Sequence, residues 1–157
     1  MGTRRVAPPG LAMDEAEIIE FMTAGFGRPF TWPIESLDES GLRLVKPAEA
    51  GELRPGGTIS GPTVMTLADA AAYMVLISRI GPQPLAVTTN LNCDFLRRPR
   101  PGELVADASV LKLGRSLALI DVMMHSRDDR GKLTPPVARA AVTYSLALLT
   151  DPPEPPR

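Results

Sequence analysis

The pattern of apolar and polar positions divides the chain into a first half that favours helices and a second half that favours strands. Residues 14–24 begin with acidic residues and carry apolar residues on one side, which predicts a short helix. A polar turn separates residues 34–37 from residues 42–45, and this pattern predicts a hairpin. Residues 63–80 are apolar on nearly every side and stop at Gly81, which predicts a long helix buried inside the fold.

After residue 84 the sequence becomes rich in strand-forming residues. Turns that contain glycine, proline or aspartate separate four long predicted strands, at residues 85–96, 104–113, 117–125 and 137–149. Consecutive strands joined by short turns pair antiparallel. We therefore expect an α+β fold in which a curved antiparallel sheet of about five to six strands wraps one long central helix.

The length of 157 residues and the lack of any internal repeat favour a single domain over residues 1–157. The polar, proline-containing segments 1–13 and 150–157 are typical of disordered tails. No apolar stretch follows the basic residues at the start, so we expect no secretory signal and a cytoplasmic location. Asp69 lies in the middle of the apolar helix, which argues against a membrane span.

Composition excludes several classes of site. The single Cys excludes a disulfide framework and a cysteine-based zinc site, and the single histidine, His125, excludes a metal site built on histidines. A formal net charge of −1 argues against nucleic acid as a partner. We expect neither a metal nor a bound cofactor.

Asp69 is the most informative residue, because a carboxylate within an apolar helix is costly unless it is paired or hydrogen-bonded. One interpretation is a structural aspartate that fixes a neighbouring loop. The other is a general base or nucleophile whose pKa is tuned by its surroundings.

The start of the same helix is a second candidate, at Ser60, Gly61 and Pro62. Free backbone N–H groups at a helix N-terminus suit a developing oxyanion, although Ser60 is also an ordinary N-cap residue. Gly61 and Asp69 are eight positions apart, which is ~12 Å along a helix. Since both groups would have to lie within ~3 Å of one reacting carbonyl, a shared site requires Gly61 from one chain and Asp69 from another.

Dimerisation is also expected from the fold, because a sheet that wraps one helix leaves part of that helix uncovered. We expect sheets to pair edge to edge in a homodimer, with further pairing into a dimer of dimers.

Basic residues near the predicted strand ends form a third candidate and would suit the phosphates of coenzyme A, or else are ordinary solvated turn residues. They are Arg97, Arg98, Arg100, Lys112 and Arg115. Tyr73 and Trp32 would line an acyl pocket or serve only in packing.

Six motifs occur in an order and at spacings that resemble the hotdog-fold thioesterases, in the branch related to the phenylacetate-pathway thioesterases. They are Gly-Thr-Ile-Ser-Gly (57–61), Thr-Leu-Ala-Asp-Ala-Ala (66–71), Val-Thr-Thr-Asn-Leu-Asn-Cys-Asp-Phe-Leu-Arg-Arg-Pro (87–99), Pro-Gly-Glu-Leu (101–104), Val-Leu-Lys-Leu-Gly-Arg-Ser-Leu-Ala (110–118) and Ala-Arg-Ala-Ala-Val-Thr-Tyr (138–144).

The resemblance implies an acyl-CoA thioesterase for a small, medium-chain or aromatic acyl group, with coenzyme A present only as part of the substrate. It implies Asp69 as base or nucleophile, the Gly61 N–H as oxyanion donor and Thr88 as an aid to positioning water. It also implies that these residues meet across the dimer.

Two departures from the family pattern bear on substrate binding. Ser60-Gly61-Pro62 replaces the usual His-Gly-Gly, and Arg54 stands where some relatives carry an Asn. Arg54 would orient the acyl group or water, or would be solvated. The missing histidine leaves a non-catalytic acyl-CoA binding or sensing protein as an alternative, and a hydratase or dehydratase as a weaker one.

Overall fold

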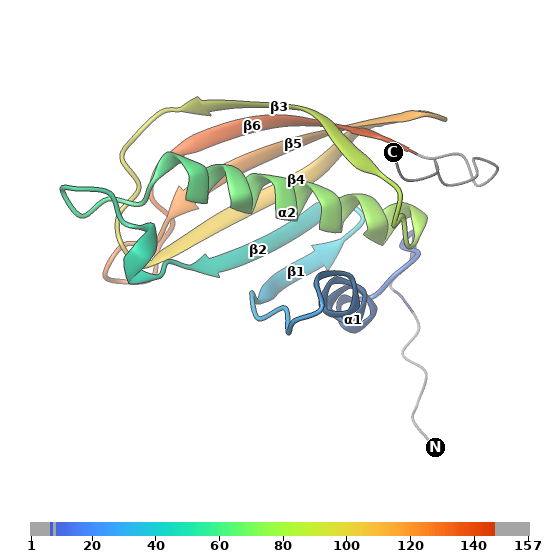
Figure 1. Ribbon diagram of the computed structural model, residues 1–157, viewed down its shortest axis with the longest axis horizontal. Helices are drawn as coiled ribbons and strands as arrows, with labels where there is room; N and C mark the ends of the chain where they lie inside the picture. The colour runs from blue at the N-terminus through green and yellow to red at the C-terminus, as the bar shows by residue number, and fades with distance from the viewer. Residues whose placement is uncertain (1–6, 8, 147–157) are drawn as a thin grey trace, which may run out of the picture.

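The computed structural model describes residue 7 and residues 9–146, and it holds one long helix against one face of a curved sheet (Figure 1). Its elements are α1 (Glu15–Phe26), β1 (Ile34–Asp38), β2 (Gly41–Pro47), the 3-10 helix η1 (Ala50–Glu52), α2 (Gly61–Ile80), β3 (Val87–Phe95), β4 (Glu103–Leu113), β5 (Leu117–Ser126) and β6 (Ala138–Ser145). The predicted α+β class with a central helix and an antiparallel sheet is confirmed.

The sheet has six strands in the order β1-β2-β4-β5-β6-β3, and every neighbouring pair is antiparallel. The strand that follows α2 in the chain, β3, therefore crosses to the edge next to β6. Within the described part of the chain β3 pairs on one side only. Its other side offers backbone groups to a further strand.

The central helix α2 begins at Gly61, two residues before the predicted start at residue 63. Ser60 is its N-cap and accepts a hydrogen bond from the Thr63 N–H at 3.4 Å. Pro62 falls in the first turn, where an N–H has no intrahelical partner, so the proline does not delay the helix. Gly81 ends it with φ of 86°, a backbone conformation that glycine adopts without strain.

The structure describes part of the predicted N-terminal tail and none of the predicted C-terminal tail. The last strand spans Ala138–Ser145, and residues 147–149 of the predicted strand lie outside the described residues. The predicted tails at 1–6, 8 and 150–157 lie outside the described residues. Residues 12 and 13 of the predicted N-terminal tail belong to the fold, because the N–H groups of Ala12 and Met13 donate to the Ser78 carbonyl and Met13 is buried.

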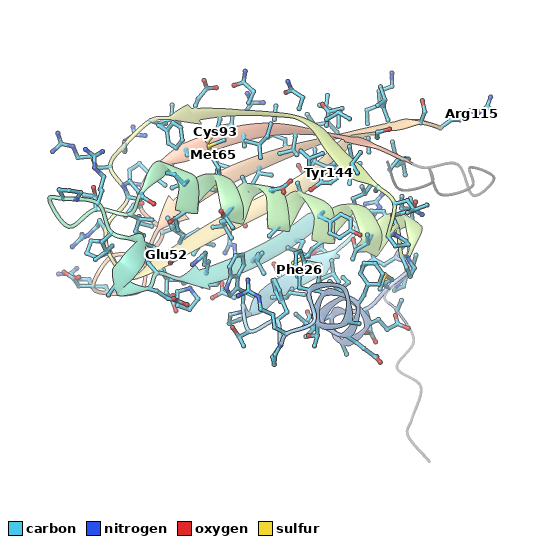
Figure 2. All side chains as sticks on the ribbon, viewed as in Figure 1. Phe26, Glu52, Met65, Cys93, Arg115 and Tyr144 are labelled. Atoms are coloured by element: carbon cyan, nitrogen blue, oxygen red, sulfur yellow. The ribbon has the colours of Figure 1, made fainter. Side chains whose placement is uncertain are left out.

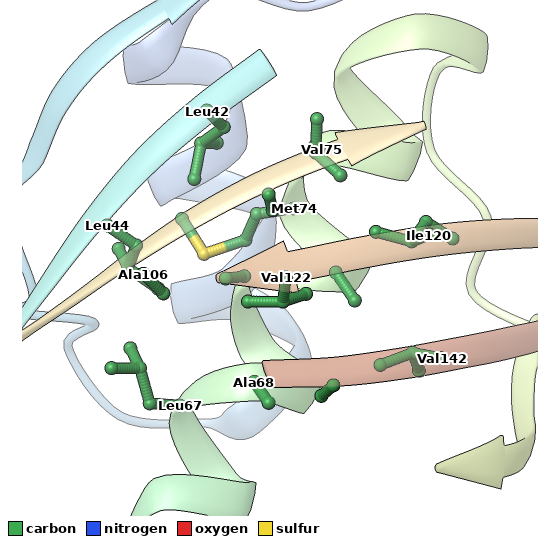
Figure 3. Packing of buried hydrophobic residues seen from close by; sticks show 14 of the residues in the cluster. Leu42, Leu44, Leu67, Ala68, Met74, Val75, Ala106, Ile120, Val122 and Val142 are labelled. Atoms are coloured by element: carbon green, nitrogen blue, oxygen red, sulfur yellow. The ribbon is translucent and has the colours of Figure 1, made fainter. Parts of the chain in front are cut away.

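The core lies between α2 and the inner face of the sheet (Figure 3). Small residues on both sides, such as Ala68 on α2 and Ala106 on β4, allow the helix to approach the strands closely. By length and composition alone α2 would be long enough to cross a membrane, yet most of it is buried within the fold, as in the core helix of a globular protein.

One side of α2 is not covered by the sheet. Eleven of its 20 residues are buried, and the uncovered side carries Met65, Thr66, Asp69 and Tyr73. The helix α1 lies beside this side and beneath β1, as Figure 1 shows. The fold thus leaves a space along α2 with Asp69 on its wall.

Candidate active site

The Asp69 carboxylate is held by two side chains from neighbouring strands. The Thr88 hydroxyl on β3 donates to Asp69 Oδ1 at 2.8 Å, and the Tyr144 hydroxyl on β6 lies 2.6 Å from the same oxygen. The antiparallel register of β3 and β6 places Thr88 directly opposite Tyr144, so both reach one oxygen. In the described part of the chain, Oδ2 accepts no hydrogen bond and is free to act on another group.

Tyr144 is the residue that the sequence reasoning missed as part of the site. Its hydroxyl also lies 3.0 Å from the Asp69 carbonyl, and its side chain is buried. Burial, followed by the hydrogen bond to the Asp69 carboxylate, raises the pKa of Tyr144 far above its ordinary value. The hydroxyl therefore stays protonated and acts as a donor. The alternation of β6 could have signalled this position, because Tyr144 follows Ala140 and Val142 on the inner face.

Tyr73, predicted as a substrate-binding residue, packs against Tyr144 at a ring-centroid distance of 5.7 Å. Its hydroxyl donates to the Gln83 carbonyl at 2.8 Å and so does not contact Asp69. Burial raises the pKa of Tyr73. Figure 2 shows Tyr144 beside α2, and the Tyr73 ring stacks on the Tyr144 ring.

A pocket of about 780 Å³ opens beside Asp69. Its walls combine apolar and aromatic side chains with a few charged ones, and most of them come from α1, the loop after α1, β2 and α2. Among the lining residues are Phe26, Phe30, Trp32, Lys46, Glu52 and Tyr73. Such a mixture is typical of a pocket that binds an apolar group and orients it with a small number of polar contacts.

Gly61 does not share this pocket. It lines a second hollow of about 450 Å³ together with Arg54, Phe95, Arg97 and Arg98. A Cβ on Gly61 would meet only the Phe95 ring, at 3.5 Å, which is ordinary contact. Packing within one chain therefore does not require glycine there.

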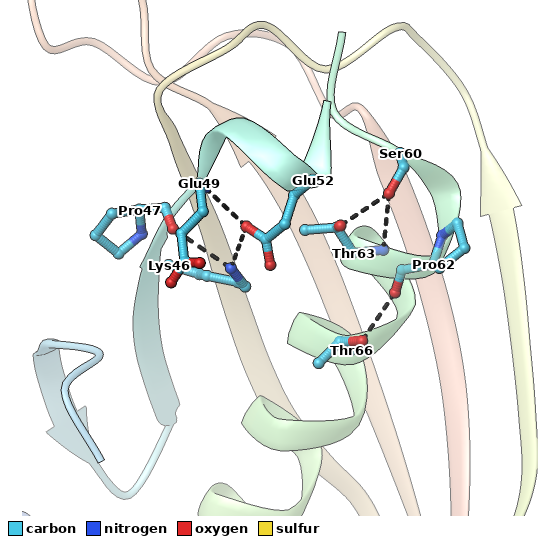
Figure 4. A network of polar contacts seen from close by, with 8 residues as sticks. All are labelled: Lys46, Pro47, Glu49, Glu52, Ser60, Pro62, Thr63 and Thr66. Carbon is cyan, nitrogen blue, oxygen red and sulfur yellow. Dashed lines mark hydrogen bonds and ion pairs between the residues drawn. The ribbon is translucent and has the colours of Figure 1, made fainter. Parts of the chain in front are cut away.

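Ser60 performs the capping role that was one of its two interpretations. Besides accepting from Thr63 N, its Oγ lies 2.8 Å from Thr63 Oγ1 (Figure 4). Arg54 is exposed in the loop before the helix, where its N–H donates to the Thr58 carbonyl at 2.8 Å. Both residues lie near Gly61 and away from Asp69.

The predicted set of basic residues is divided between the two ends of the sheet. Arg97 and Arg98 follow β3 and lie near Gly61, with Arg97 donating to the Pro136 carbonyl at 2.8 Å. Lys112 lies near the end of β4 and Arg115 in the turn that follows, and Figure 2 shows Arg115 at the opposite tip of the molecule. The expectation of one basic group is wrong for a single chain, because β4 carries the backbone away from the end where β3 finishes.

The fifth basic residue, Arg100, is paired weakly with Asp129 at 3.4 Å. In the described part of the chain, no group of three or more His, Cys, Asp or Glu side chains converges as metal ligands would.

Comparisons with known proteins give matches to thioesterases and esterases. Residues 56–132 match the family described as the thioesterase superfamily. A crystal structure of a "putative thioesterase" from Silicibacter sp. TM1040 is 34% identical with a TM-score of 0.77, covering 92% of this chain and 100% of that one. A "putative esterase" from Thermoplasma acidophilum is 24% identical over 102 residues, which cover 65% of this chain and 76% of that protein.

A "hypothetical thioesterase" from Streptococcus pneumoniae, solved with coenzyme A, is 19% identical with a TM-score of 0.65. The match covers 82% of this chain and 94% of that one. At this identity the likeness is one of fold.

Proposed function

This chain belongs to the thioesterase superfamily and has its hotdog fold, and from that premise we propose that it hydrolyses acyl-CoA thioesters to the free acid and coenzyme A. The acyl group is small, medium-chain or aromatic, because apolar and aromatic side chains form much of the wall of the pocket beside Asp69. The single free cysteine, Cys93, fits a cytoplasmic location.

The observation that carries the proposal is the unequal environment of the two Asp69 oxygens. Thr88 and Tyr144 hold Oδ1 and Asp69 lines the pocket, so Oδ2 is the oxygen left to act as a fixed base or nucleophile. A carboxylate held in this way loses little conformational freedom when it reacts. The two contacts also tie α2 to β3 and β6, but they use only one of the two carboxylate oxygens.

The chemistry follows from these positions. Asp69 Oδ2 removes a proton from water, the water oxygen forms a bond to the thioester carbonyl carbon, and the carbonyl oxygen takes the negative charge. Collapse of this intermediate breaks the carbon–sulfur bond and releases the coenzyme A thiolate, which is then protonated. In the alternative route Oδ2 bonds to the carbonyl carbon, the carbon–sulfur bond breaks to release the coenzyme A thiolate, and water then hydrolyses the resulting anhydride. Turnover in heavy-oxygen water labels the Asp69 carboxylate only in the second route.

The oxyanion donor of this proposal is the Gly61 N–H of a second copy. In one chain Gly61 and Asp69 line different hollows and are ~12 Å apart along α2. Antiparallel pairing of the free β3 edges in a homodimer would bring the start of one α2 toward Asp69 of the other. Exposed apolar side chains at both ends of β3, Val87 and Phe95, would be covered by this pairing. A dimer of dimers is the further assembly that we propose.

A mixing experiment tests the shared site. Asp69→Asn and Gly61→Pro are each expected to be inactive, the second because it removes the N–H at a helix position that tolerates proline. Unfolding and refolding the two together should restore about a quarter of wild-type activity, because half of the dimers are mixed and each has one intact site. No recovery would refute a site shared between chains.

Coenzyme A fits the hollow beside Gly61, where Arg54, Arg97 and Arg98 supply positive charge for its phosphates. The bound coenzyme A in the fold relative from Streptococcus pneumoniae supports this ligand. Lys112 and Arg115 would contact the same nucleotide only from a second copy. The motifs at 66–71 and 87–99 favour the phenylacetate-pathway branch, so phenylacetyl-CoA belongs in the substrate panel.

The decisive test of the function is a hydrolysis screen over acyl-CoA thioesters with Asp69→Asn as its partner variant. The substitution keeps the size of the side chain and should abolish turnover while the protein remains folded. Turnover that is unchanged in Asp69→Asn would overturn the assignment.

One observation favours a second function, a non-catalytic acyl-CoA binding protein. The residue that replaces the family histidine, Ser60, uses its hydroxyl to cap α2, so it supplies no substitute for the lost imidazole. Tight acyl-CoA binding without hydrolysis by the wild-type protein would select this alternative.

A further inference from the structure

The segment from Glu52 to Ser60 forms a short hairpin that leads the chain into α2. Leu53 and Ile59 form an antiparallel bridge between its two arms, and the Ser60 N–H donates to the Glu52 carbonyl at 2.9 Å. Gly61 follows Ser60 directly and is the first residue of α2. The direction of the Gly61 N–H therefore depends on how the base of this hairpin, formed by Glu52 and Ser60, is held.

Lys46 on β2 ties the base of the hairpin to the sheet. Its Nζ donates to Glu52 Oε2 at 2.6 Å (Figure 4), and its side chain is only 4% exposed. The same Nζ lies 5.0 Å from the centre of the Trp32 ring. Because β2 pairs with β1 on one side and with β4 on the other, Lys46 connects the hairpin to a strand that is hydrogen-bonded along both edges.

Glu52 forms the link because its side chain and its backbone are both engaged. The carboxylate accepts from Lys46 and from the Glu49 N–H, and the carbonyl accepts from Ser60. Burial acts to raise the pKa of Glu52, but these hydrogen bonds to the carboxylate and the positive charge of Lys46 hold it below its ordinary value. Glu52 is therefore ionised at neutral pH, and its contact with Lys46 is a charge-assisted hydrogen bond, which is stronger than a neutral one.

The Gly61 N–H is not fixed by a hydrogen bond of its own. Within residues 7 and 9–146 it donates to no acceptor, as expected for an N–H in the first turn of a helix. An oxyanion donor is effective only at ~2.7–3.1 Å from the developing charge, and a misplacement of about 1 Å costs about a hundredfold in rate. The position of this N–H is consequently set by its neighbours, Ser60 and the hairpin.

Two other roles for Lys46 lead to different expectations. Buried ion pairs can often be replaced by apolar residues without loss of stability, so stability alone does not explain a lysine at so buried a position. Lys46 also lines the pocket beside Asp69 of its own chain. From that wall it would act on the site of its own Asp69, whereas through Gly61 it would act on the site of the partner subunit's Asp69.

We propose that Lys46 is a positioning residue for the oxyanion donor, and that it holds the Gly61 N–H in place through Glu52 and Ser60. The inference rests on the proposed hydrolysis at a site shared between two chains, and it adds a residue that controls the geometry of that site. In this role Lys46 touches neither the thioester nor the attacking water. Its effect reaches the reaction only through the chain segment that carries Gly61.

Steady-state kinetics give the first test. Lys46→Met removes the ammonium group and should lower kcat by about ten- to hundredfold. Glu52→Gln keeps the backbone carbonyl and the shape of the side chain and should also lower kcat, and the double variant should lose no more than the larger single loss, because both residues act through one contact. Lys132→Met, the same change at an exposed turn, should retain the wild-type kcat. A wild-type kcat in Lys46→Met, or multiplied losses in the double variant, would overturn the inference.

Mixed dimers show which site Lys46 serves. Refolding Lys46→Met together with Asp69→Asn should restore about a quarter of wild-type activity, because the remaining Asp69 meets a Gly61 N–H held by an intact Lys46. Refolding Lys46→Met together with Gly61→Pro should give no gain, because the only intact Gly61 belongs to the chain that lacks Lys46. When the reference mixture of Asp69→Asn and Gly61→Pro recovers, any other pattern overturns the inference, and the reverse pattern places Lys46 in the site of its own Asp69.

Hydrogen exchange gives a result that does not depend on activity. The Glu52 carbonyl protects the Ser60 N–H, which should exchange at least about tenfold faster in Lys46→Met, while N–H groups within β4 keep their wild-type rates. If the wild-type protein hydrolyses no thioester, or if the reference mixture does not recover, the proposed function or its shared site falls, and this measurement decides on the inference. Unchanged exchange of Ser60 would overturn it. Should Lys46→Met fail to fold, Glu52→Gln takes its place in the mixtures and in the exchange measurement.

Discussion

The hydrogen bond from Tyr144 to Asp69 makes a sharp prediction for the substitution Tyr144→Phe, which removes one oxygen atom from the site. The hydroxyl lies 2.6 Å from Asp69 Oδ1, and a hydrogen bond to a charged group contributes about 1.5–3 kcal/mol. If this contribution keeps Oδ2 aimed at the reacting group, its loss lowers kcat by about ten- to hundredfold. KM should stay within about twofold, because Tyr144 binds the carboxylate and not the acyl group.

The matched comparison is Tyr73→Phe, the same chemical change in the ring stacked on Tyr144. The Tyr73 hydroxyl donates to the Gln83 carbonyl and leaves Asp69 untouched, so this variant should retain a kcat at least about tenfold above that of Tyr144→Phe. Release of the coenzyme A thiol, followed with a chromogenic thiol reagent, gives kcat and KM for both. Thermal unfolding of each variant shows whether the fold is preserved.

Two results would refute this reasoning. A kcat for Tyr144→Phe equal to that of the wild type would show that Thr88 alone holds the carboxylate. Equal losses in both tyrosine variants, accompanied by equal losses of thermal stability, would assign the effect to packing of the two rings.

The other predictions concern single groups around the same helix. Gly61→Pro should lower kcat by about a hundred- to thousandfold with the fold intact, whereas Gly61→Ala, which keeps the N–H, should lower it far less in the same assay. Thr88→Val removes the second donor to Oδ1 and should lower kcat by about tenfold. In a double-mutant cycle with Tyr144→Phe, the loss of activation free energy in the double variant should differ from the sum of the losses in the two single variants. Ser60→Ala should lower the free energy of unfolding by about 1 kcal/mol by loss of the cap, seen in urea titration, with little effect on kcat. Burial and Asp69 raise the pKa of Tyr144 in the folded protein. The contribution of Tyr144 to the free energy of unfolding should therefore stay constant up to about pH 10, where tyrosine in the unfolded chain ionises, and should decline above it. A decline of the same size in Tyr144→Phe would contradict this origin.

Much of the fold could be predicted because its signals are local. The alternation in β4 and β5 and the apolar run in α2 specify their secondary structure within a few neighbouring residues. The prediction differed from the structure where a segment depends on a distant partner: Met13, placed in the predicted tail, is buried and donates its N–H to the Ser78 carbonyl on α2.

The candidate site could be predicted only in part. Asp69 could be identified because a charged residue within an apolar helix is recognisable from the sequence alone. The alternation of β6 could place Tyr144 on the inner face of the sheet. Its contact with Asp69 could not be predicted, since it joins residues 75 positions apart and depends on the register that sets Thr88 opposite Tyr144. The parts of the pocket wall supplied by Lys46 and Glu52 were missed for the same reason, whereas Trp32, one of the two aromatic residues predicted for an acyl pocket, does line it.

The amino-acid sequence by itself determined the order of the elements, the central helix with its capped ends, and the presence of one isolated carboxylate on that helix. These features follow from periodicity, capping and the cost of burying charge, which act between close neighbours in the chain. The tertiary structure alone decided which Asp69 oxygen is held, which residues face it, and that Gly61 and the two basic groups lie elsewhere. Strand register and helix–sheet packing set those distances, and both arise from contacts between segments far apart in the chain.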